Sequence, residues 1–228
     1  MPVEANLKQV MDRIAAAAKR AHRDPSSIKL VTVTKTVDQD RIRQAVTAGA
    51  TILGENRVQE AKEKIERLGR IASWHLIGRL QTNKAKYAVK LFDLIHSVDN
   101  LDLAQELDKQ AEKIGKKQDI LIEVNIAGEA QKSGVEVVNA VSLVRDAARF
   151  SHLAIKGLMT IPPFSEHAED SRQYYRKMRE LAQEIGREHI PGVSMSELSM
   201  GMSGDFEVAI EEGATLVRVG TAIFGDRK

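Results

Sequence analysis

Strand-like and helix-like segments alternate along this chain from residue 30 to residue 220. Short runs rich in β-branched and other apolar residues are each followed by a segment with helical spacing. The runs cover residues 30-35, 51-54, 73-77, 94-98, 119-126, 153-159, 195-199 and 215-220. Strands that alternate with helices pair in parallel, and eight such units in 228 residues fit a closed barrel. We therefore expect an α/β fold, a single (β/α)8 TIM-type barrel.

The segments between the runs support this interpretation, because they combine apolar residues at helical spacing with good helix formers. Examples are residues 40-46, 56-68 and 101-114. An extra amphipathic helix is expected over about residues 4-22, before the first strand. No linker divides the chain, so we expect residues 1-228 to form one domain. A doubly wound open sheet is the alternative, but it usually carries a glycine-rich turn after its first strand, and residues 35-38 contain no glycine.

The charge and composition exclude several classes of function. The net charge is +2 from 34 basic and 32 acidic side chains, which are interspersed, so nucleic acid is not an expected partner. The chain has no cysteine, which excludes disulfides, thiolate zinc sites and a cysteine nucleophile. No apolar run approaches the length of a membrane span, and the N-terminus lacks a signal-peptide pattern. We therefore expect a cytoplasmic protein with no membrane partner and no metal site.

Lys35 occupies an unusual place, because it ends the first apolar run, where a turn residue is common. In a barrel, the carboxyl ends of the strands surround the site of chemistry, so the amine would point into that mouth. A desolvated lysine there is able to form a Schiff base with a carbonyl compound. The alternative is a strand-end lysine whose ammonium group reaches water. The run alone leaves both interpretations open.

Two segments rich in glycine and hydroxyl groups follow the last two expected strands. Residues 199-205 contain two glycines and two serines, and Gly220 and Thr221 end the final strand. Barrels of this type commonly hold a phosphate group with these loops and a helix N-terminus. Each segment alone is also explained as an ordinary turn or helix cap. Their occurrence after both of the last strands favours an anion site.

Arg218 lies on the same face of the last strand as Leu216 and Gly220, so it faces the mouth if Gly220 does. A buried arginine needs a partner. That partner is either a carboxylate, such as Asp205 or Glu207, or a bound ligand. An amine, an anion cradle and an inward arginine together describe a pocket for a phosphorylated aldehyde. Pyridoxal 5'-phosphate (PLP) fits this description best.

Specific motifs occur along nearly the whole chain. They are residues 31-36, 54-60, 74-84, 132-134, 157-160, 199-203 and 218-221. In content and order these motifs resemble the pyridoxal phosphate homeostasis protein family. That family is similar to the barrel domain of alanine racemase, and its members are described as PLP carriers or regulators without an established enzymatic activity. The resemblance implies a non-catalytic protein of intracellular cofactor homeostasis that holds PLP as a Schiff base.

The resemblance also implies a role for individual residues. Lys35 matches the Schiff-base lysine, and Arg218 matches the residue beside the pyridine nitrogen. The positions that match phosphate contacts are Ser203, Gly220 and Thr221. The positions that match the pocket lining are Asn56, His75, Ile77 and Met200. For His75, a core histidine between Trp74 and Leu76 is the alternative.

Lys132 is a second amine, in the loop after the fifth expected strand, and it matches a characteristic lysine of the family. We hypothesise that it assists entry or transfer of the aldehyde. The alternative is a solvated surface lysine, which the polar neighbours of Lys132 favour. The partners implied by the resemblance are PLP and acceptor apo-enzymes, and we expect a monomer.

Catalysis is not expected. An arginine beside the ring nitrogen opposes the protonation that makes PLP an effective electron sink. Racemisation needs acid/base groups on both faces of the substrate carbon, and Lys35 supplies at most one. The tyrosines, Tyr87, Tyr174 and Tyr175, fall in helix-patterned segments away from the expected strand ends. The alternatives are a racemase-like enzyme, a Schiff-base aldolase for a sugar phosphate, and an interaction protein that uses the barrel only as a scaffold.

Overall fold

Eight parallel strands close into a barrel in the computed structural model, which describes residues 2-225. In order around the ring they are β1 (Lys29–Val33), β2 (Ile52–Glu55), β3 (Ser73–Leu76), β4 (Leu94–Val98), β5 (Gln118–Asn125), β7 (Leu153–Met159), β8 (Val193–Ser199) and β9 (Leu216–Val219). Each strand pairs with the next, and β9 pairs with β1, which closes the ring. A short strand, β6 (Val135–Glu136), extends the sheet beside the end of β5. The expected barrel is confirmed.

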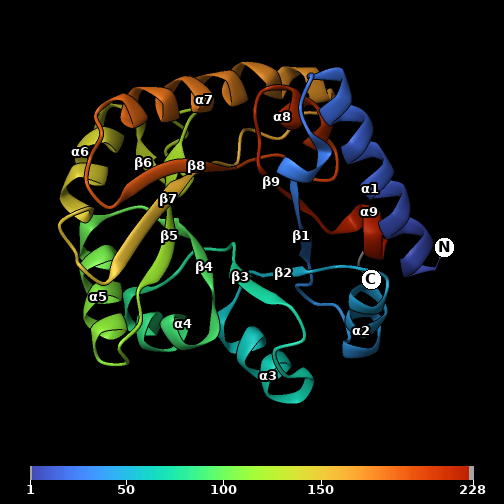
Figure 1. Cartoon of the computed structure of the whole chain (residues 1–228), viewed down its shortest axis with the longest axis horizontal. Coiled ribbons are helices and arrows are strands. Elements are labelled where there is room, and N and C mark those ends of the chain that lie inside the picture. The colour runs from blue at the N-terminus through green and yellow to red at the C-terminus, as the bar shows by residue number, and fades with distance from the viewer. Residues whose placement is uncertain (1, 226–228) are drawn as a thin grey trace.

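A helix follows each barrel strand and lies outside the ring (Figure 1). These helices are α2 (Gln39–Thr47), α3 (Val58–Leu68), α4 (Ala85–Leu91), α5 (Leu101–Glu112), α6 (Val137–Ala147), α7 (Arg172–Arg187), α8 (Phe206–Glu211) and α9 (Thr221–Phe224). Short 3-10 helices occur at Pro25–Ser27, Thr82–Lys84 and Ala168–Ser171. Side chains cap two of the α-helices within residues 2-225, because Asp38 accepts the Arg41 N–H at α2 and Asn100 accepts the Leu103 N–H at α5. No helix within residues 2-225 is long and apolar enough to cross a membrane.

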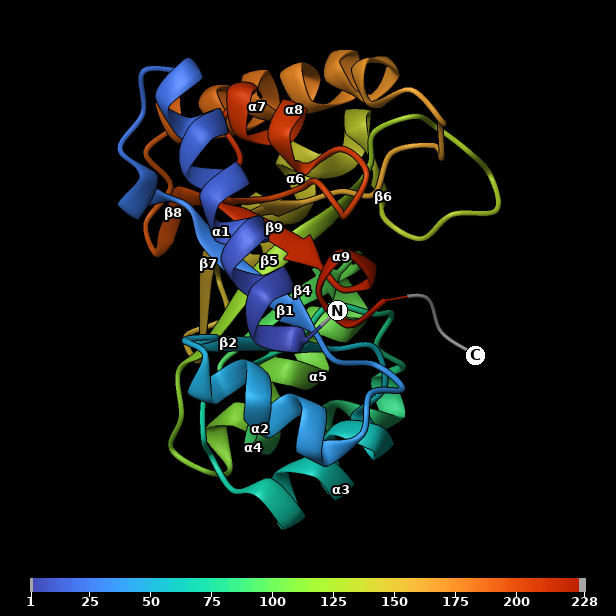
Figure 2. The same ribbon diagram turned by 90° about the vertical axis from the view of Figure 1, so that its right-hand side faces the viewer.

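The extra N-terminal helix is also confirmed, as α1 (Val3–Arg20). Its buried face presents Leu7, Val10 and Ile14 at helical spacing. The helix contacts α2, α8 and α9, and the Asn6 side chain donates to the Ile223 carbonyl oxygen at 2.9 Å. In Figure 2 it crosses in front of β1 and β9. α1 therefore covers the seam at which the two ends of the sheet meet.

Apolar side chains fill two separate layers. One cluster contains Val33, Leu121 and Leu216 and comes from alternate positions of the strands, which places it inside the ring. A second, larger cluster lies between the strands and the helices. On β5 and β9 the residue two positions after the named interior residue faces the same side, and the residue two positions after Val33 lies just beyond the end of β1; all three are charged. These residues are Lys35, Glu123 and Arg218.

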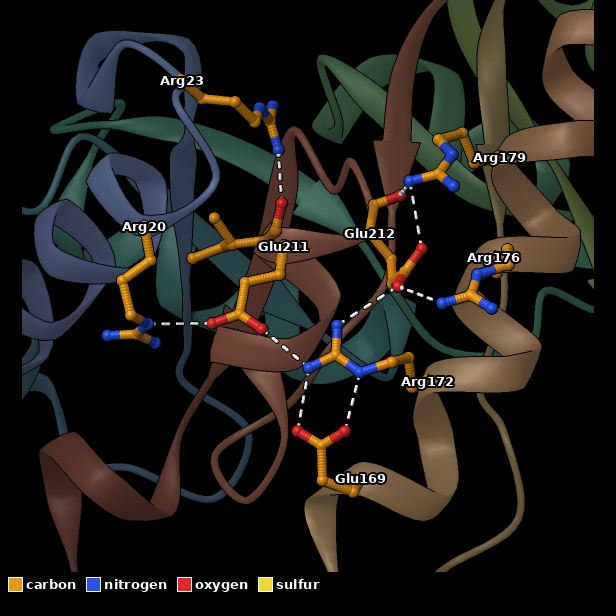
Figure 3. Close-up of polar contacts among 9 residues, drawn as sticks. Arg20, Arg23, Glu169, Arg172, Arg176, Arg179, Glu211 and Glu212 are labelled. Atoms are coloured by element: carbon orange, nitrogen blue, oxygen red, sulfur yellow. Dashed lines mark hydrogen bonds and ion pairs between the residues drawn. The ribbon is translucent and has the colours of Figure 1, made fainter.

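An ion-pair network fixes α7 against the end of α8 (Figure 3). The carboxylate of the buried Glu212 lies 3.2 Å from Arg172, 3.1 Å from Arg176 and 3.0 Å from Arg179. These arginines follow one face of α7, so three cations converge on one carboxylate. Arg172 also pairs with Glu211 at 2.7 Å. Burial raises the pKa of Glu212, but the hydrogen bonds from Arg176 and Arg172 lower it, and the pKa lies below its ordinary value.

Candidate functional site

A cavity of about 450 Å³ lies at the carboxyl ends of the barrel strands, where barrels of this type carry their sites. The predicted site residues that line it are Lys35, Asn56, Ile77, Ser203, Arg218, Gly220 and Thr221. His75 and Met200 are not among the lining residues, and Met200 is fully buried. Lys35 follows β1, Ser203 follows β8 and Thr221 follows β9. The pairing of β1 with β9 therefore brings both ends of the sequence to one site.

Lys35 lies in a turn after β1, and not at the last position of the strand as expected. β1 ends at Val33, and the Thr34 carbonyl oxygen accepts the Val37 N–H at 3.0 Å, which closes a four-residue turn. The φ angle of Thr36 is 60°, a left-handed conformation that type II turns usually give to glycine or asparagine. Lys35 nevertheless lines the cavity, on the same side as Val33.

Arg218 lines the cavity although it is only 4% exposed. Its guanidinium group donates to Ser199 Oγ at 2.6 Å and to the Thr160 carbonyl oxygen at 2.8 Å. Of the two carboxylates that the sequence offers as partners, Glu207 pairs with Arg13 instead, at 3.1 Å. Burial lowers the pKa of Arg218, but an arginine stays a hydrogen-bond donor only. Its orientation is therefore set by a hydroxyl and a carbonyl group.

A chain of hydrogen bonds continues from Arg218 across the interior of the barrel. Ser199 Oγ lies 2.9 Å from His96 Nδ1, and His96 Nε2 lies 3.0 Å from His75 Nδ1. Arg218 only donates, so Ser199 Oγ accepts from it, and the tautomers of His96 and His75 set which atoms donate in the two contacts beyond. Burial lowers the pKa of His75 to about 4 and holds that of His96 well below its ordinary value, so both rings are neutral. His75 thus supports the arginine through His96.

The loop after β8 and the start of α9 form a candidate anion cradle. Ser203 Oγ lies 3.4 Å from the backbone nitrogens of Gly220 and Ala222, a long separation that leaves these donors weakly engaged. Asp205 fixes the loop, because its carboxylate accepts the Met202 N–H at 2.7 Å. Hydroxyl and backbone donors therefore gather at one side of the cavity.

The expectation that all the tyrosines lie away from the site is wrong for Tyr175. Its buried hydroxyl donates to Asp205 Oδ2 at 2.6 Å, and Asp205 lines the cavity. Burial and the Asp205 carboxylate raise the pKa of Tyr175. A helix that follows a barrel strand starts near the carboxyl end of that strand, and Tyr175 lies in the first turn of α7. The helical pattern alone does not show how close that turn comes to the mouth.

Glu123 lines the same cavity, and the sequence reasoning did not identify it. It is 6% exposed and follows the interior residue Leu121 by two positions on β5. Burial and, to a smaller extent, Asp99 raise the pKa of Glu123 to about 7, while Arg218 acts in the opposite direction. A signal was available, because a glutamate in the middle of the apolar run 119-126 has to face either the core or the site.

Lys132 belongs to the loop between β5 and β6, which projects from the barrel (Figure 2). Its ammonium group pairs with Glu129 of the same loop. The neighbouring Ser133 lines the cavity, so Lys132 is one residue away from the cavity wall. Its role in entry or transfer stays a prediction.

The class of this protein follows from its fold and from a match over nearly its whole length. Residues 5-228 match the family model for the alanine racemase N-terminal domain, so the chain is a barrel of that class. It superposes on the alanine racemase of Clostridium difficile 630 with a TM-score of 0.75 and 15% sequence identity. The match covers 98% of this chain and 57% of that one. At this identity the likeness shows the fold alone.

Proteins that this chain matches over nearly their whole length are more similar to it. The pyridoxal phosphate homeostasis protein of Aquifex aeolicus is 49% identical over 223 residues, which cover 97% of each chain. PipY of Synechococcus elongatus PCC7942, solved with PLP bound, superposes with a TM-score of 0.84 and 36% identity, covering 95% of this chain and 100% of that one. This chain belongs to the pyridoxal phosphate homeostasis protein family. The resemblance seen in its motifs is thereby confirmed.

Proposed function

We propose that this chain binds PLP in the cavity at the carboxyl ends of its strands and holds it as a Schiff base on Lys35. The observation that carries the proposal is the presence of an amine, an anion cradle and a buried arginine in one cavity. The PLP bound to PipY and the names of the relatives support this choice of ligand. The protein then acts as a carrier, buffer or regulator in intracellular PLP homeostasis, without catalysis.

The dimensions and donors of the cavity suit this ligand. A volume of about 450 Å³ lies in the range of small-molecule sites. The donors that we assign to the phosphate are the hydroxyls of Ser203 and Thr221 and the backbone N–H groups of Gly220 and Ala222. We assign Asn56 and Ile77, on the remaining wall, to contacts with the ring. We assign His75 to the support of Arg218, and Met200 to packing around the site.

Arg218 determines what the bound ligand is able to do. PLP supplies an aldehyde for a Schiff base and a ring that withdraws electrons most strongly when its nitrogen is protonated. Arg218 offers only donors, so beside that nitrogen it keeps the ring unprotonated. Its hydrogen bonds to Ser199 and Thr160 hold the guanidinium group in one orientation. These properties favour holding the ligand over using it in catalysis.

We propose further that residues 1-228 act as a single PLP-binding domain, as a cytoplasmic monomer that passes its ligand to acceptor apo-enzymes. The match to a relative over 97% of both chains supports one domain. Analytical ultracentrifugation tests the monomer. Mixing the loaded protein with an excess of a PLP-dependent apo-enzyme, and following the activity that appears, tests delivery.

The test of the Schiff base is a visible spectrum after incubation with PLP and removal of the free ligand. We expect the absorbance band of a protein Schiff base in the wild type and its loss in Lys35→Ala. Lys8→Ala is the control, because the side chain of Lys8 is 77% exposed and is not among the residues that line the cavity. Borohydride reduction and peptide mass analysis should identify Lys35 as the modified residue. A colourless wild type, or a band that persists in Lys35→Ala, contradicts the proposal.

A racemase-like enzyme is the second candidate, and Glu123 is the observation that favours it. Racemisation needs two acid/base groups, and Glu123 shares the cavity with Lys35 from β5, the strand opposite β1 in the ring. Turnover of an amino-acid enantiomer that is abolished in both Lys35→Ala and Glu123→Gln would favour this enzyme. The trapping experiment separates both candidates from a sugar-phosphate aldolase, because the mass of the adduct differs.

A further inference from the structure

A cluster of charged residues, two of them buried and one half-buried, lies against the turn that carries Lys35. Lys64 of α3 is 6% exposed, and Glu55 at the end of β2 is fully buried. The Lys64 ammonium group lies 2.7 Å from Glu55 Oε1 and 2.7 Å from Glu60 Oε1. None of these three residues lines the cavity. Their charges therefore have no role in the ligand contacts proposed for the cavity.

Thr34, the residue before Lys35, bonds to this cluster twice. Its hydroxyl donates to Glu55 Oε1 at 2.6 Å, and its carbonyl oxygen accepts from Lys64 Nζ at 2.5 Å. Its backbone N–H donates to the Gly54 carbonyl oxygen of β2 at 2.9 Å. The hydroxyl, the carbonyl and the N–H of this one residue are thus all fixed.

Thr36, the residue after Lys35, is held by the same cluster. Its backbone N–H donates to Glu60 Oε1 at 2.5 Å, and that oxygen also accepts from Lys64. The φ angle of 60° is unfavourable for a β-branched residue and persists only where the surroundings impose it. Glu60 supplies such a restraint. Strained backbone of this kind is concentrated at functional sites.

From these contacts we propose that Glu55, Glu60 and Lys64 are positioning residues, which hold both neighbours of Lys35 and thereby aim its amine into the cavity. This inference rests on the proposed function, because it explains why the amine has to be fixed. A buried ion pair is by itself weak evidence for stability, since desolvation offsets the attraction. The point of attachment is the informative part, because the cluster bonds to the two residues that flank one lysine. The rate of addition to a carbonyl depends steeply on the distance and angle of the attacking amine.

Glu60→Ala tests the proposal with little risk to folding. The side chain of Glu60 is 25% exposed, and its removal leaves Lys64 paired with Glu55. Glu60→Gln is the conservative variant, because its amide oxygen still accepts the Thr36 N–H. Glu63→Ala is the matched control, since it removes the same charge from an exposed position of the same helix. Thr34→Val is a second test, which removes the bond to Glu55 and leaves Glu60 in place.

Two measurements on the full-length proteins separate positioning from a merely structural role. The first is the rate at which the Schiff-base band forms with PLP. The second is the affinity for pyridoxine 5'-phosphate, which has the same ring and phosphate but no aldehyde. We expect Glu60→Ala and Thr34→Val to slow band formation about tenfold or more and to leave the affinity for pyridoxine 5'-phosphate unchanged. Glu60→Gln should recover most of the rate, and Glu63→Ala should match the wild type.

Equal rates of band formation in the wild type and Glu60→Ala would overturn the proposal. Parallel losses of rate, of pyridoxine 5'-phosphate affinity and of thermal stability would also overturn it, because they indicate a general structural defect. Absence of the band in the wild type is a different outcome, which refutes the proposed function itself. The two failures are therefore distinguishable.

Discussion

Glu123 makes the stability of the ligand-free protein depend on pH in an unusual direction. The pKa of its buried carboxyl group is about 7, whereas the ordinary value is 4.5. Between these values the folded chain retains a proton that the unfolded chain has released. The free energy of unfolding therefore decreases as the pH rises from 4.5 to about 7. Below pH 4.5 Glu123 does not make the free energy of unfolding depend on pH. Above about pH 7 the decrease in the free energy of unfolding is complete.

The size of this effect follows from the same pKa. One pKa unit corresponds to about 1.4 kcal/mol, so a rise from 4.5 to about 7 corresponds to about 3 kcal/mol of unfolding free energy. Burial is the main cause and Asp99 adds to it, while Arg218, Arg79 and a hydrogen bond with Ser133 act in the opposite direction. Glu123→Gln keeps the shape of the side chain and removes its titration. We expect this variant to be about 3 kcal/mol more stable than the wild type above pH 7 and equally stable below pH 4.5.

Urea unfolding at several pH values between about 4 and 8 measures this difference. The fluorescence of Trp74, the one tryptophan of the chain, reports unfolding because its side chain is fully buried. Subtracting the wild type from Glu123→Gln cancels the titration of the other groups, and Glu180→Gln, at an exposed position of α7, is the control. A difference in stability between Glu123→Gln and the wild type that does not change with pH would refute the reasoning.

Two further predictions concern the helix network and the projecting loop. Glu212→Gln leaves Arg172, Arg176 and Arg179 without their shared carboxylate. Because these arginines are partly exposed, we expect a loss of about 2 kcal/mol at neutral pH in urea unfolding, less than for a fully buried pair, and an unchanged unfolding curve would contradict it. Lys132→Ala is expected to slow both loading of PLP and its transfer to an apo-enzyme without removing the absorbance band. Unchanged rates of both steps would exclude the proposed role of Lys132.

The fold could be predicted from the sequence because its determinants are local. Each strand and each helix has its own periodicity, and the order of these elements leaves few possible arrangements. The same applies to Lys35 and Arg218, since a charged residue in an apolar strand stands out in the sequence. The face of Arg218 could be assigned from two-residue spacing and the place of Lys35 from the end of the apolar run, and both residues line the cavity. Lys35 was expected to end its strand, whereas the strand ends two residues earlier, at Val33.

The rest of the site depends on contacts between distant segments, which no local pattern encodes. Nothing in the run that contains His75 indicates that its ring pairs with His96 of the next strand. Likewise, in the sequence Lys64 is only one of several charged residues of a helix. Its contact with the turn at Thr34 is evident only from the packing of α3 in the structure. Tyr175 was not expected near the site, because the sequence pattern predicts its helix but not how close the first turn of that helix comes to the cavity. The contacts that connect these residues to the site exist only in the closed barrel, so the sequence pattern does not predict them.

Closure of the ring between β1 and β9 also has a consequence for the synthesis of the chain. On the ribosome, a nascent chain acquires Lys35 early, but it lacks Arg218 and the start of α9 until the segment that contains β9 and α9 has been made. The partly made chain therefore has the proposed Schiff-base lysine without the groups that we assign to the phosphate. Ligand that binds only the closed ring stabilises that state in proportion to its free concentration. Tight capture of the ligand would thus mark a chain that has been translated through β9 and α9 and has closed its barrel.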